Sequence, residues 1–307
     1  MSRTASRSSE DENQSSSSLP VIPVEGEALV QSLAETESHL PAPIDINVTR
    51  ALQISLPQLS WLHYDLVPSR LKLANVAGQT VILSARWERT SGPPTVAGGP
   101  LSGRYVFSQL HFHWGATALD GSEHTVDGDR LPLELHLVHY NERFDSQDAA
   151  RLVPGGILCV VYFFKLSPTP NRFLAPLLKA LTAVLLPDSG TNLKPFPLCD
   201  LFHPFTDEYF VYWGSLDSGT VRTPLLWMLS RRQESIEFRQ LKKFNRLLDN
   251  RLWRLEDQPP NRAPSAVLPA QGRHLFHANP RTPMVVSTLA MDPPEKYIQA
   301  TAGTVAH

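Results

Sequence analysis

The sequence is poor in the features that mark several large classes of protein. Its 307 residues contain only two cysteines, too few for a disulfide framework. The longest apolar run, Ile157–Phe164, is far shorter than the roughly 20 apolar residues of a membrane helix, so no membrane span is expected. Residues 1–18 hold eight serines and no apolar stretch, unlike a secretory signal. We therefore expect a cytoplasmic protein.

An excess of charge of either sign is also missing. The chain has 28 basic and 30 acidic residues, for a formal net charge of −2. This balance argues against a nucleic acid or an acidic membrane as a partner, since both attract strongly basic chains. Apolar residues make up 42%, which is enough for a substantial core, and the 27 prolines favour turns and strands over long helices.

Changes in amino-acid composition divide the sequence into three parts. We predict a disordered, serine-rich leader over residues 1–40, one folded domain over 41–280, and a weakly ordered tail over 281–307. The leader could serve a protein partner, although a solvated tail is the simpler interpretation. Within the domain, short apolar stretches alternate with turn signals, which indicates a sheet-dominated fold. Helical spacing of apolar residues predicts helices over 171–186 and 234–248.

Histidines are concentrated in one part of the chain. Five of the 11 fall within 29 residues, at His111, His113, His124, His136 and His139. Residues 109–114 and 133–138 both alternate between polar and apolar side chains, which predicts two strands with one polar face each. The first polar face carries Gln109, His111 and His113, and the second carries Glu134 and His136 together with Val138. Two antiparallel neighbours of this kind would present three imidazoles to one point.

Three imidazoles at one point suit a catalytic zinc site, in which water takes the fourth tetrahedral position. A metal-bound imidazole also needs a partner for its other N–H group, and Gln109 and Glu134 lie on the right faces to provide one. A His-x-His pair by itself is weak evidence, because polar faces of exposed strands carry such pairs. The addition of His136 and Glu134 makes zinc the better interpretation.

Three blocks carry a resemblance to a known family. Gln109–Gly115, Gly121–Asp127 and Glu134–Asn141 resemble the zinc-site segments of the α-class carbonic anhydrases, and Tyr212–Leu216 adds support. The similarity covers roughly residues 41–280. It implies a mostly β (α+β) single domain, built around a large, mainly antiparallel twisted sheet with short peripheral helices. It also implies a Zn²⁺ cofactor and the reversible hydration of carbon dioxide to bicarbonate and a proton, with this small molecule as the substrate.

The resemblance implies a role for each matching residue. His111, His113 and His136 would be the zinc ligands, with Gln109 and Glu134 as their supporting partners. Glu123 resembles the acidic residue that orients the attacking hydroxide through a hydroxyl group. The apolar wall that holds carbon dioxide would consist of Val138, Cys159, Leu216 and Trp227. His124 and His139 would be structural.

Two departures from the family pattern put the rate in doubt. Asp217 stands where the family has a threonine that accepts a hydrogen bond from the hydroxide and donates one to the residue matching Glu123. An ionised aspartate cannot donate, a protonated one could, and a local shift could put Ser218 or Thr220 in the threonine's place. Gln79 occupies the position of the proton-shuttle histidine and cannot titrate.

We expect an active but impaired carbonate dehydratase. The main alternative is a catalytically weak or inactive relative that binds zinc and acts through protein interactions, and a different zinc hydrolase is a third.

Overall fold

The computed structural model describes residues 26–76, 80–217, 221–254 and 272–280. The predicted tail of residues 281–307 and Gln79, Ser218 and Thr220 lie outside these ranges. The strands are β1 (Asp45–Ile46), β2 (Leu52–Leu56), β3 (Ser60–Leu62), β4 (Arg70–Val76), β5 (Thr80–Arg86), β6 (Thr95–Ala97), β7 (Tyr105–Trp114), β8 (Thr125–Val126), β9 (Leu133–Asn141), β10 (Ile157–Ser167), β11 (Gly190–Leu193), β12 (Tyr209–Asp217), β13 (Arg222–Ser230), β14 (Glu234–Glu237) and β15 (Phe276–Pro280).

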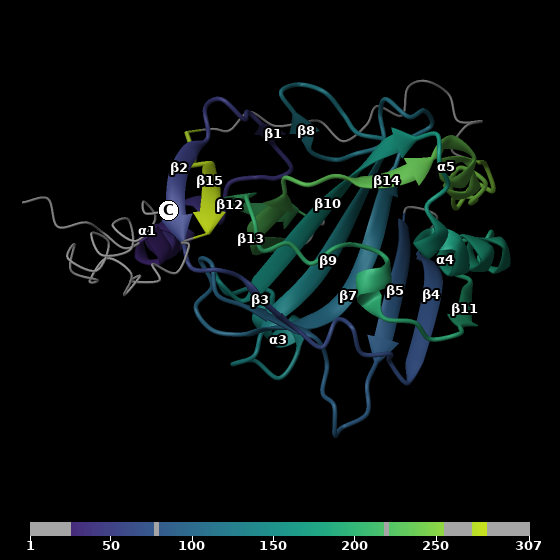
Figure 1. Ribbon diagram of the computed structural model, residues 1–307, viewed down its shortest axis with the longest axis horizontal. Coiled ribbons are helices and arrows are strands. Elements are labelled where there is room, and N and C mark those ends of the chain that lie inside the picture. The colour runs from purple at the N-terminus through teal and green to yellow at the C-terminus, as the bar shows by residue number, and fades with distance from the viewer. Residues whose placement is uncertain (1–25, 77–79, 218–220, 255–271, 281–307) are drawn as a thin grey trace, which may run out of the picture.

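Thirteen of these strands form one twisted sheet, which runs through the whole molecule (Figure 1). Its main path has the order β11-β4-β5-β7-β9-β10-β13-β12-β15-β2. Most neighbours are antiparallel, whereas β10 runs parallel to β13 and β14, and β15 runs parallel to β2. The predicted mostly β fold with a large, mainly antiparallel sheet is therefore confirmed.

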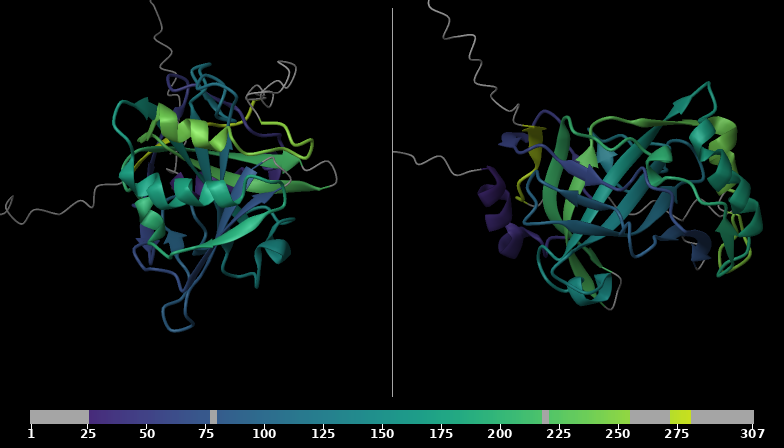
Figure 2. Two further views of the ribbon diagram at one scale, coloured as in Figure 1. Left: turned by 90° about the vertical axis from the view of Figure 1, so that its right-hand side faces the viewer. Right: turned by 60° about the horizontal axis from the view of Figure 1, so that its bottom comes forward.

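The helices are short and lie at the ends and edges of the sheet (Figure 1; Figure 2). They are α1 (Gly26–Ser32), α2 (Ala34–Glu37), α3 (Gln147–Ala150), α4 (Ala175–Ala180) and α5 (Phe238–Phe244), with 3₁₀ turns η1 (Arg172–Leu174), η2 (Leu181–Ala183) and η3 (Leu198–Asp200). Within the described ranges, no helix combines the length and the apolar character that crossing a membrane would require.

Both predicted helices need correction. The segment predicted as one helix over 171–186 is a 3₁₀ turn, a short α-helix and a second 3₁₀ turn, ending at Ala183. The helix predicted over 234–248 begins only at Phe238, because residues 234–237 pair with β10 as strand β14. Glu237 and Gln240 form a capping box that fixes this start. Apolar spacing did not distinguish the strand from the first helical turn.

The N-terminal region also differs from expectation. Residues 26–40 belong to the predicted leader, yet α1 and α2 pack on the sheet, with Val30 and Ala34 buried. The indole Nε1 of Trp213 donates a hydrogen bond to the Val30 carbonyl at 2.7 Å. The sequence suggests a short helix over Ala28–Leu33, but so few apolar contacts give no sign that this segment packs on the sheet.

Apolar clusters cover both faces of the sheet. On β9, Leu133, Leu135 and Leu137 point into the larger cluster, whereas Val138 belongs to a smaller cluster on the opposite face. All four side chains are buried. Glu134 and His136 share the face of Val138 and the smaller cluster, because side chains alternate along a strand. His136 therefore lies inside the molecule beside an apolar wall.

Candidate metal centre

The register of two strands brings the histidines together. Strands β7 and β9 are antiparallel neighbours and pair His113 with Glu134, His111 with His136, and Gln109 with Val138. Directly opposite residues share a face, so the polar faces of the two strands coincide. A bulge at Ser108, the extra residue between the pairs of Phe107 and Gln109, sets this register.

The three imidazoles His111, His113 and His136 form a compact group. Each offers one ring nitrogen, and these nitrogens all lie within 4.8 Å of one another. The ring centroid of His136 is 5.0 Å from that of His111 and 4.5 Å from that of His113. Nitrogen donors at these separations suit a single tetrahedral metal ion.

Two nitrogens of this group are buried and have no hydrogen-bond partner among the described residues. They are Nε2 of His113 and Nδ1 of His136. An unsatisfied buried polar atom costs about 1–3 kcal/mol, so such atoms normally have a partner. A zinc ion would satisfy both at once. Because zinc prefers nitrogen donors of this kind, the three histidines fit a zinc ion.

The protonation of two imidazoles favours metal binding, since a ligand nitrogen must be neutral. Burial and the neighbouring His136 lower the pKa of His113 to about 3. Burial, together with the nearby imidazoles, also lowers the pKa of His111 well below its ordinary value.

Glu134 supports the centre through a buried network. Its Oε1 accepts hydrogen bonds from Nε2 of His136 and, at 2.7 Å, from Nδ1 of His124. Its Oε2 accepts the backbone N–H groups of Glu123 at 2.8 Å and His124 at 2.9 Å. Burial opposes the charge, but His124 and His136 hold the pKa of Glu134 well below its usual range. The carboxylate thus fixes the ring of His136 and the loop that carries Glu123.

A second group of potential ligands, His124, Glu134 and His136, overlaps this network. Its atoms already bond to one another, and Nε2 of His124 pairs with the Tyr212 hydroxyl at 2.6 Å. The group thus acts as a hydrogen-bonded support, and His124 has both nitrogens occupied. The sequence analysis missed the part of Tyr212, although this residue lies in the supporting block 212–216.

His139 lies on the other face of β9. Its Nδ1 donates to the Leu137 carbonyl at 3.1 Å, and its Nε2 contacts the Tyr64 hydroxyl. Burial lowers the pKa of His139 to about 3, so the ring is neutral. With both nitrogens bonded, His139 is part of the core packing.

Gln109 and Glu123 contact the two histidines of β7. Oε1 of Gln109 accepts a hydrogen bond from Nδ1 of His111 at 3.2 Å. Oε1 of Glu123 lies 3.3 Å from Nδ1 of His113, a contact that the sequence analysis did not anticipate. Burial raises the pKa of the Glu123 carboxyl above its ordinary value. Each of the three histidines therefore has a side-chain oxygen beside its other nitrogen.

The apolar residues singled out in the sequence form one wall. Val138 of β9 lies opposite Cys159 of β10, and Cys159 lies opposite Trp227 of β13. All three are buried, and Leu216 of β12 packs against the same cluster. The indole ring of Trp227 lies 5.4 Å from the His136 ring, between centroids. The wall thus begins directly beside the imidazole group.

Asp217 is placed differently from the other site residues. It ends β12 directly opposite Arg222 of β13, and Oδ2 of Asp217 lies 3.4 Å from Nη2 of Arg222. Both side chains are about half exposed, at 53% and 52%. Because side chains alternate along a strand, Asp217 shares the face of Ser215, opposite to that of Leu216. Both Ser215 and Arg222 donate hydrogen bonds to the His39 carbonyl beside it.

A comparison with known families identifies the family of the chain. The model of the eukaryotic-type carbonic anhydrases matches residues 31–264, about three quarters of the chain. The chain belongs to the eukaryotic-type carbonic anhydrase family, and its histidine group could hold a metal ion.

Individual members of the family are similar in sequence over shorter stretches. Mouse Carbonic anhydrase 7 is 39% identical over 158 residues, 50% of this chain and 58% of the relative. Rabbit Carbonic anhydrase 4 is 31% identical over 208 residues, 66% and 65% of the two chains. Human mitochondrial Carbonic anhydrase 5B is 34% identical over 164 residues, 53% and 51%. The chain thus spans about half to two thirds of the length of these curated relatives.

Proposed function

We propose that this protein catalyses the reversible hydration of carbon dioxide, with Zn²⁺ held by His111, His113 and His136. The observation that carries the proposal is the pair of buried, unpartnered nitrogens, one on His113 and one on His136, inside a group of three imidazoles. When bound in sites of this family, zinc lowers the pKa of a coordinated water to about 7, the standard value for carbonic anhydrases.

The residues of the chain prepare the site for this chemistry. Gln109, Glu123 and Glu134 each face the second nitrogen of one histidine and so orient the ring. The anionic Glu134 also strengthens the donor nitrogen of His136. We propose that Val138, Cys159, Leu216 and Trp227 hold carbon dioxide, because an uncharged apolar molecule gains from an apolar wall.

We propose that the activity is reduced at two positions. Asp217, at the position of the family threonine, pairs with Arg222 at the exposed end of β12. To form a hydrogen bond with Glu123, Asp217 would have to break its contact with Arg222. Gln79 cannot titrate, so proton release would depend on buffer. Imidazole added to a weakly buffered assay should raise the turnover; an unchanged rate would show that proton transfer is not limiting.

The second candidate is a zinc-binding relative with little or no catalysis that works through protein contacts. The position of Asp217 favours it, because an ionised carboxylate at the threonine's position cannot donate a hydrogen bond to Glu123. All residues of the imidazole group are nevertheless present, and this favours the enzyme.

Metal analysis combined with stopped-flow hydration of carbon dioxide separates the two candidates. The full chain, loaded with zinc and washed, should retain about one ion per chain. Hydration above the buffer rate then supports the enzyme. Zinc retention without any rate above buffer supports the binding protein, and failure to retain zinc contradicts both.

We also propose a cytoplasmic location. The support is that Cys159 and Cys199 are both free thiols, a state typical of reducing compartments. Fluorescence of a fusion protein tests it, and a signal confined to a secretory or mitochondrial compartment would contradict it.

A further inference from the structure

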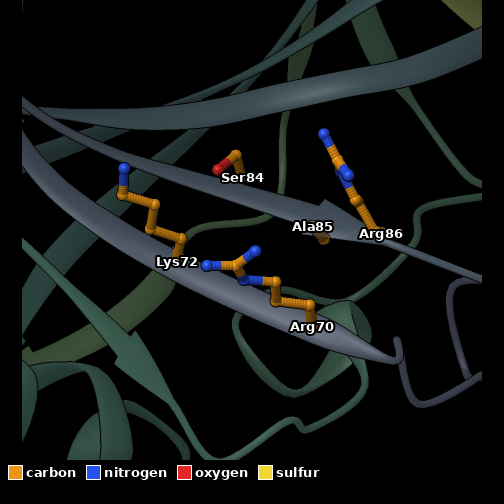
Figure 3. Close-up of a pocket in the computed structure, with 5 residues that line it drawn as sticks. All are labelled: Arg70, Lys72, Ser84, Ala85 and Arg86. Carbon is orange, nitrogen blue, oxygen red and sulfur yellow. The ribbon is translucent and has the colours of Figure 1, made fainter.

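A basic pocket lies on the outer part of the sheet, away from the histidines. It has a volume of about 320 Å³ and is lined by Arg70, Lys72, Ser84, Ala85 and Arg86. Figure 3 shows Arg70 and Lys72 rising from β4 and Ser84 and Arg86 rising from the neighbouring β5. No role in the proposed carbon dioxide reaction uses these side chains.

The pocket shares a sheet face with the metal centre. Ile82 of β5 lies directly opposite His111 of β7, so the two side chains point to the same side. Ser84 and Arg86 follow Ile82 at two-residue steps and therefore share that face. At a rise of about 3.3 Å per residue, Arg86 lies about 13 Å along β5 from Ile82. The pocket is thus a separate place on the same surface.

The register concentrates positive charge in this pocket. Arg70 lies directly opposite Arg86, and Lys72 lies directly opposite Ser84. Like charges placed opposite each other on neighbouring strands destabilise a sheet. The intervening residues of β4, Leu71 and Leu73, are fully buried on the other face. Because side chains alternate along β4, the burial of Leu71 and Leu73 on one face keeps Arg70 and Lys72 on the opposite, exposed face. There they lie beside Arg86 of β5.

The fold does not neutralise this charge. Within the described ranges, no carboxylate lies within 4.0 Å of the charged groups of Arg70, Lys72 or Arg86, although four other arginines there each have a carboxylate at this distance. Among the residues that the structure describes, the side chain of Arg70 donates only to the neutral Oδ1 of Asn192, at 3.3 Å. The strand register places like charges side by side, which costs stability, and no carboxylate of the described residues compensates them. A bound anion would supply the compensating charge.

We propose that this pocket binds the phosphate or diphosphate group of a small molecule. A guanidinium group matches two oxygens of an oxyanion at once, and Lys72 and Ser84 supply further donors. Three cations attract a multiply charged anion more strongly than they attract bicarbonate, which carries a single negative charge. The volume lies at the lower limit of small-molecule pockets, about 300 Å³, and suits a compact group. The inference is independent of the activity proposed above.

Calorimetric titration of the full chain with pyrophosphate tests the proposal. Lys72→Gln and Arg86→Gln should each weaken binding about ten-fold, because each removes a hydrogen bond between charged groups. Lys165→Gln is the matched control, since Lys165 is an exposed lysine on another strand, β10. Its affinity should equal that of the unchanged chain. Equal losses in all three variants, or no measurable binding by the unchanged chain, would overturn the proposal.

Thermal unfolding provides a second readout. Without anion, Arg86→Gln should have a Tm at least as high as the unchanged chain, because the variant removes the repulsion from Arg70. At the same concentration, pyrophosphate should raise the Tm of the unchanged chain more than that of Arg86→Gln, because the variant binds it more weakly. A lower Tm of Arg86→Gln without anion would show that the fold itself needs this arginine, and would overturn the inference.

Phosphate and pyrophosphate arms establish the charge of the group. Tighter binding of pyrophosphate than of phosphate identifies a diphosphate, and equal affinities identify a single phosphate. Preference for bicarbonate over both would overturn the assignment.

Discussion

The histidine centre and the Asp217 end of β12 serve one proposed site but are held in opposite ways. Around the centre, Glu134 is fully buried and accepts four hydrogen bonds, from His136, His124 and two backbone N–H groups. At the end of β12, Asp217 and Arg222 form a half-exposed pair. Buried, mutually satisfied groups fix one geometry, whereas an exposed pair is weakly held. Affinity for the metal should therefore be robust, and the reaction rate should be sensitive to a few surface atoms.

The largest effect should follow from removal of a ligand. His113→Ala or His136→Ala should abolish stable zinc retention and with it any hydration activity, since only two nitrogen donors would remain. Zinc content after washing, measured by atomic absorption, checks this. His203→Ala is the control, because His203 is paired with Glu234 away from the group.

Retention of zinc by both ligand variants would show that the ion binds elsewhere. Circular dichroism of the variants would confirm that each still folds, so that lost zinc reflects the lost ligand.

A smaller effect should follow from a change in the supporting network. Glu134→Gln keeps the shape but removes the charge beside His136, and it should weaken zinc affinity about 10–100-fold. Competition with a chelator measures this affinity. Glu142→Gln, at an exposed carboxylate paired with Arg104, should leave it unchanged. An unaltered affinity of Glu134→Gln would mean that the network does not support the ligand.

The centre could be predicted from the sequence because alternation dictates it. The two-residue period places Gln109, His111 and His113 on one face and Glu134 and His136 on another, and register joins these faces. The bulge at Ser108, which sets that register, left no sign in the sequence. The contact of Glu123 with His113 was also not predictable, since it depends on a loop held by backbone hydrogen bonds to Glu134.

Elements without a strong period were predicted poorly. The helices of residues 26–37 bury few side chains, and β14 turns into α5 without a change in apolar spacing. At Asp217, the sequence located the departure from the family, but not its partner. Arg222 is five residues away in the sequence. It becomes a neighbour because the pairing of β12 with β13 extends as far as Asp217.

The next prediction concerns this position. Asp217→Thr should raise kcat/KM by about ten-fold, because a threonine hydroxyl can both accept and donate a hydrogen bond. Stopped-flow measurements on the zinc-loaded chain check this, with Asp217→Asn as the variant that removes the charge without restoring a hydroxyl. If Asp217→Thr binds zinc but gains nothing, Asp217 is not what limits the rate.

The smallest effect should come from the partner of Asp217. An exposed ion pair contributes about 0–1 kcal/mol to stability, so Arg222→Gln should change the free energy of unfolding by no more than this. Chemical denaturation measures it, with Arg104→Gln as a second exposed pair for comparison. A loss well above this range would mean that Arg222 supports the chain near His39 through its hydrogen bond to the His39 carbonyl. In that case the end of β12 would be as firmly fixed as the histidine centre, and the contrast between the two regions would fail.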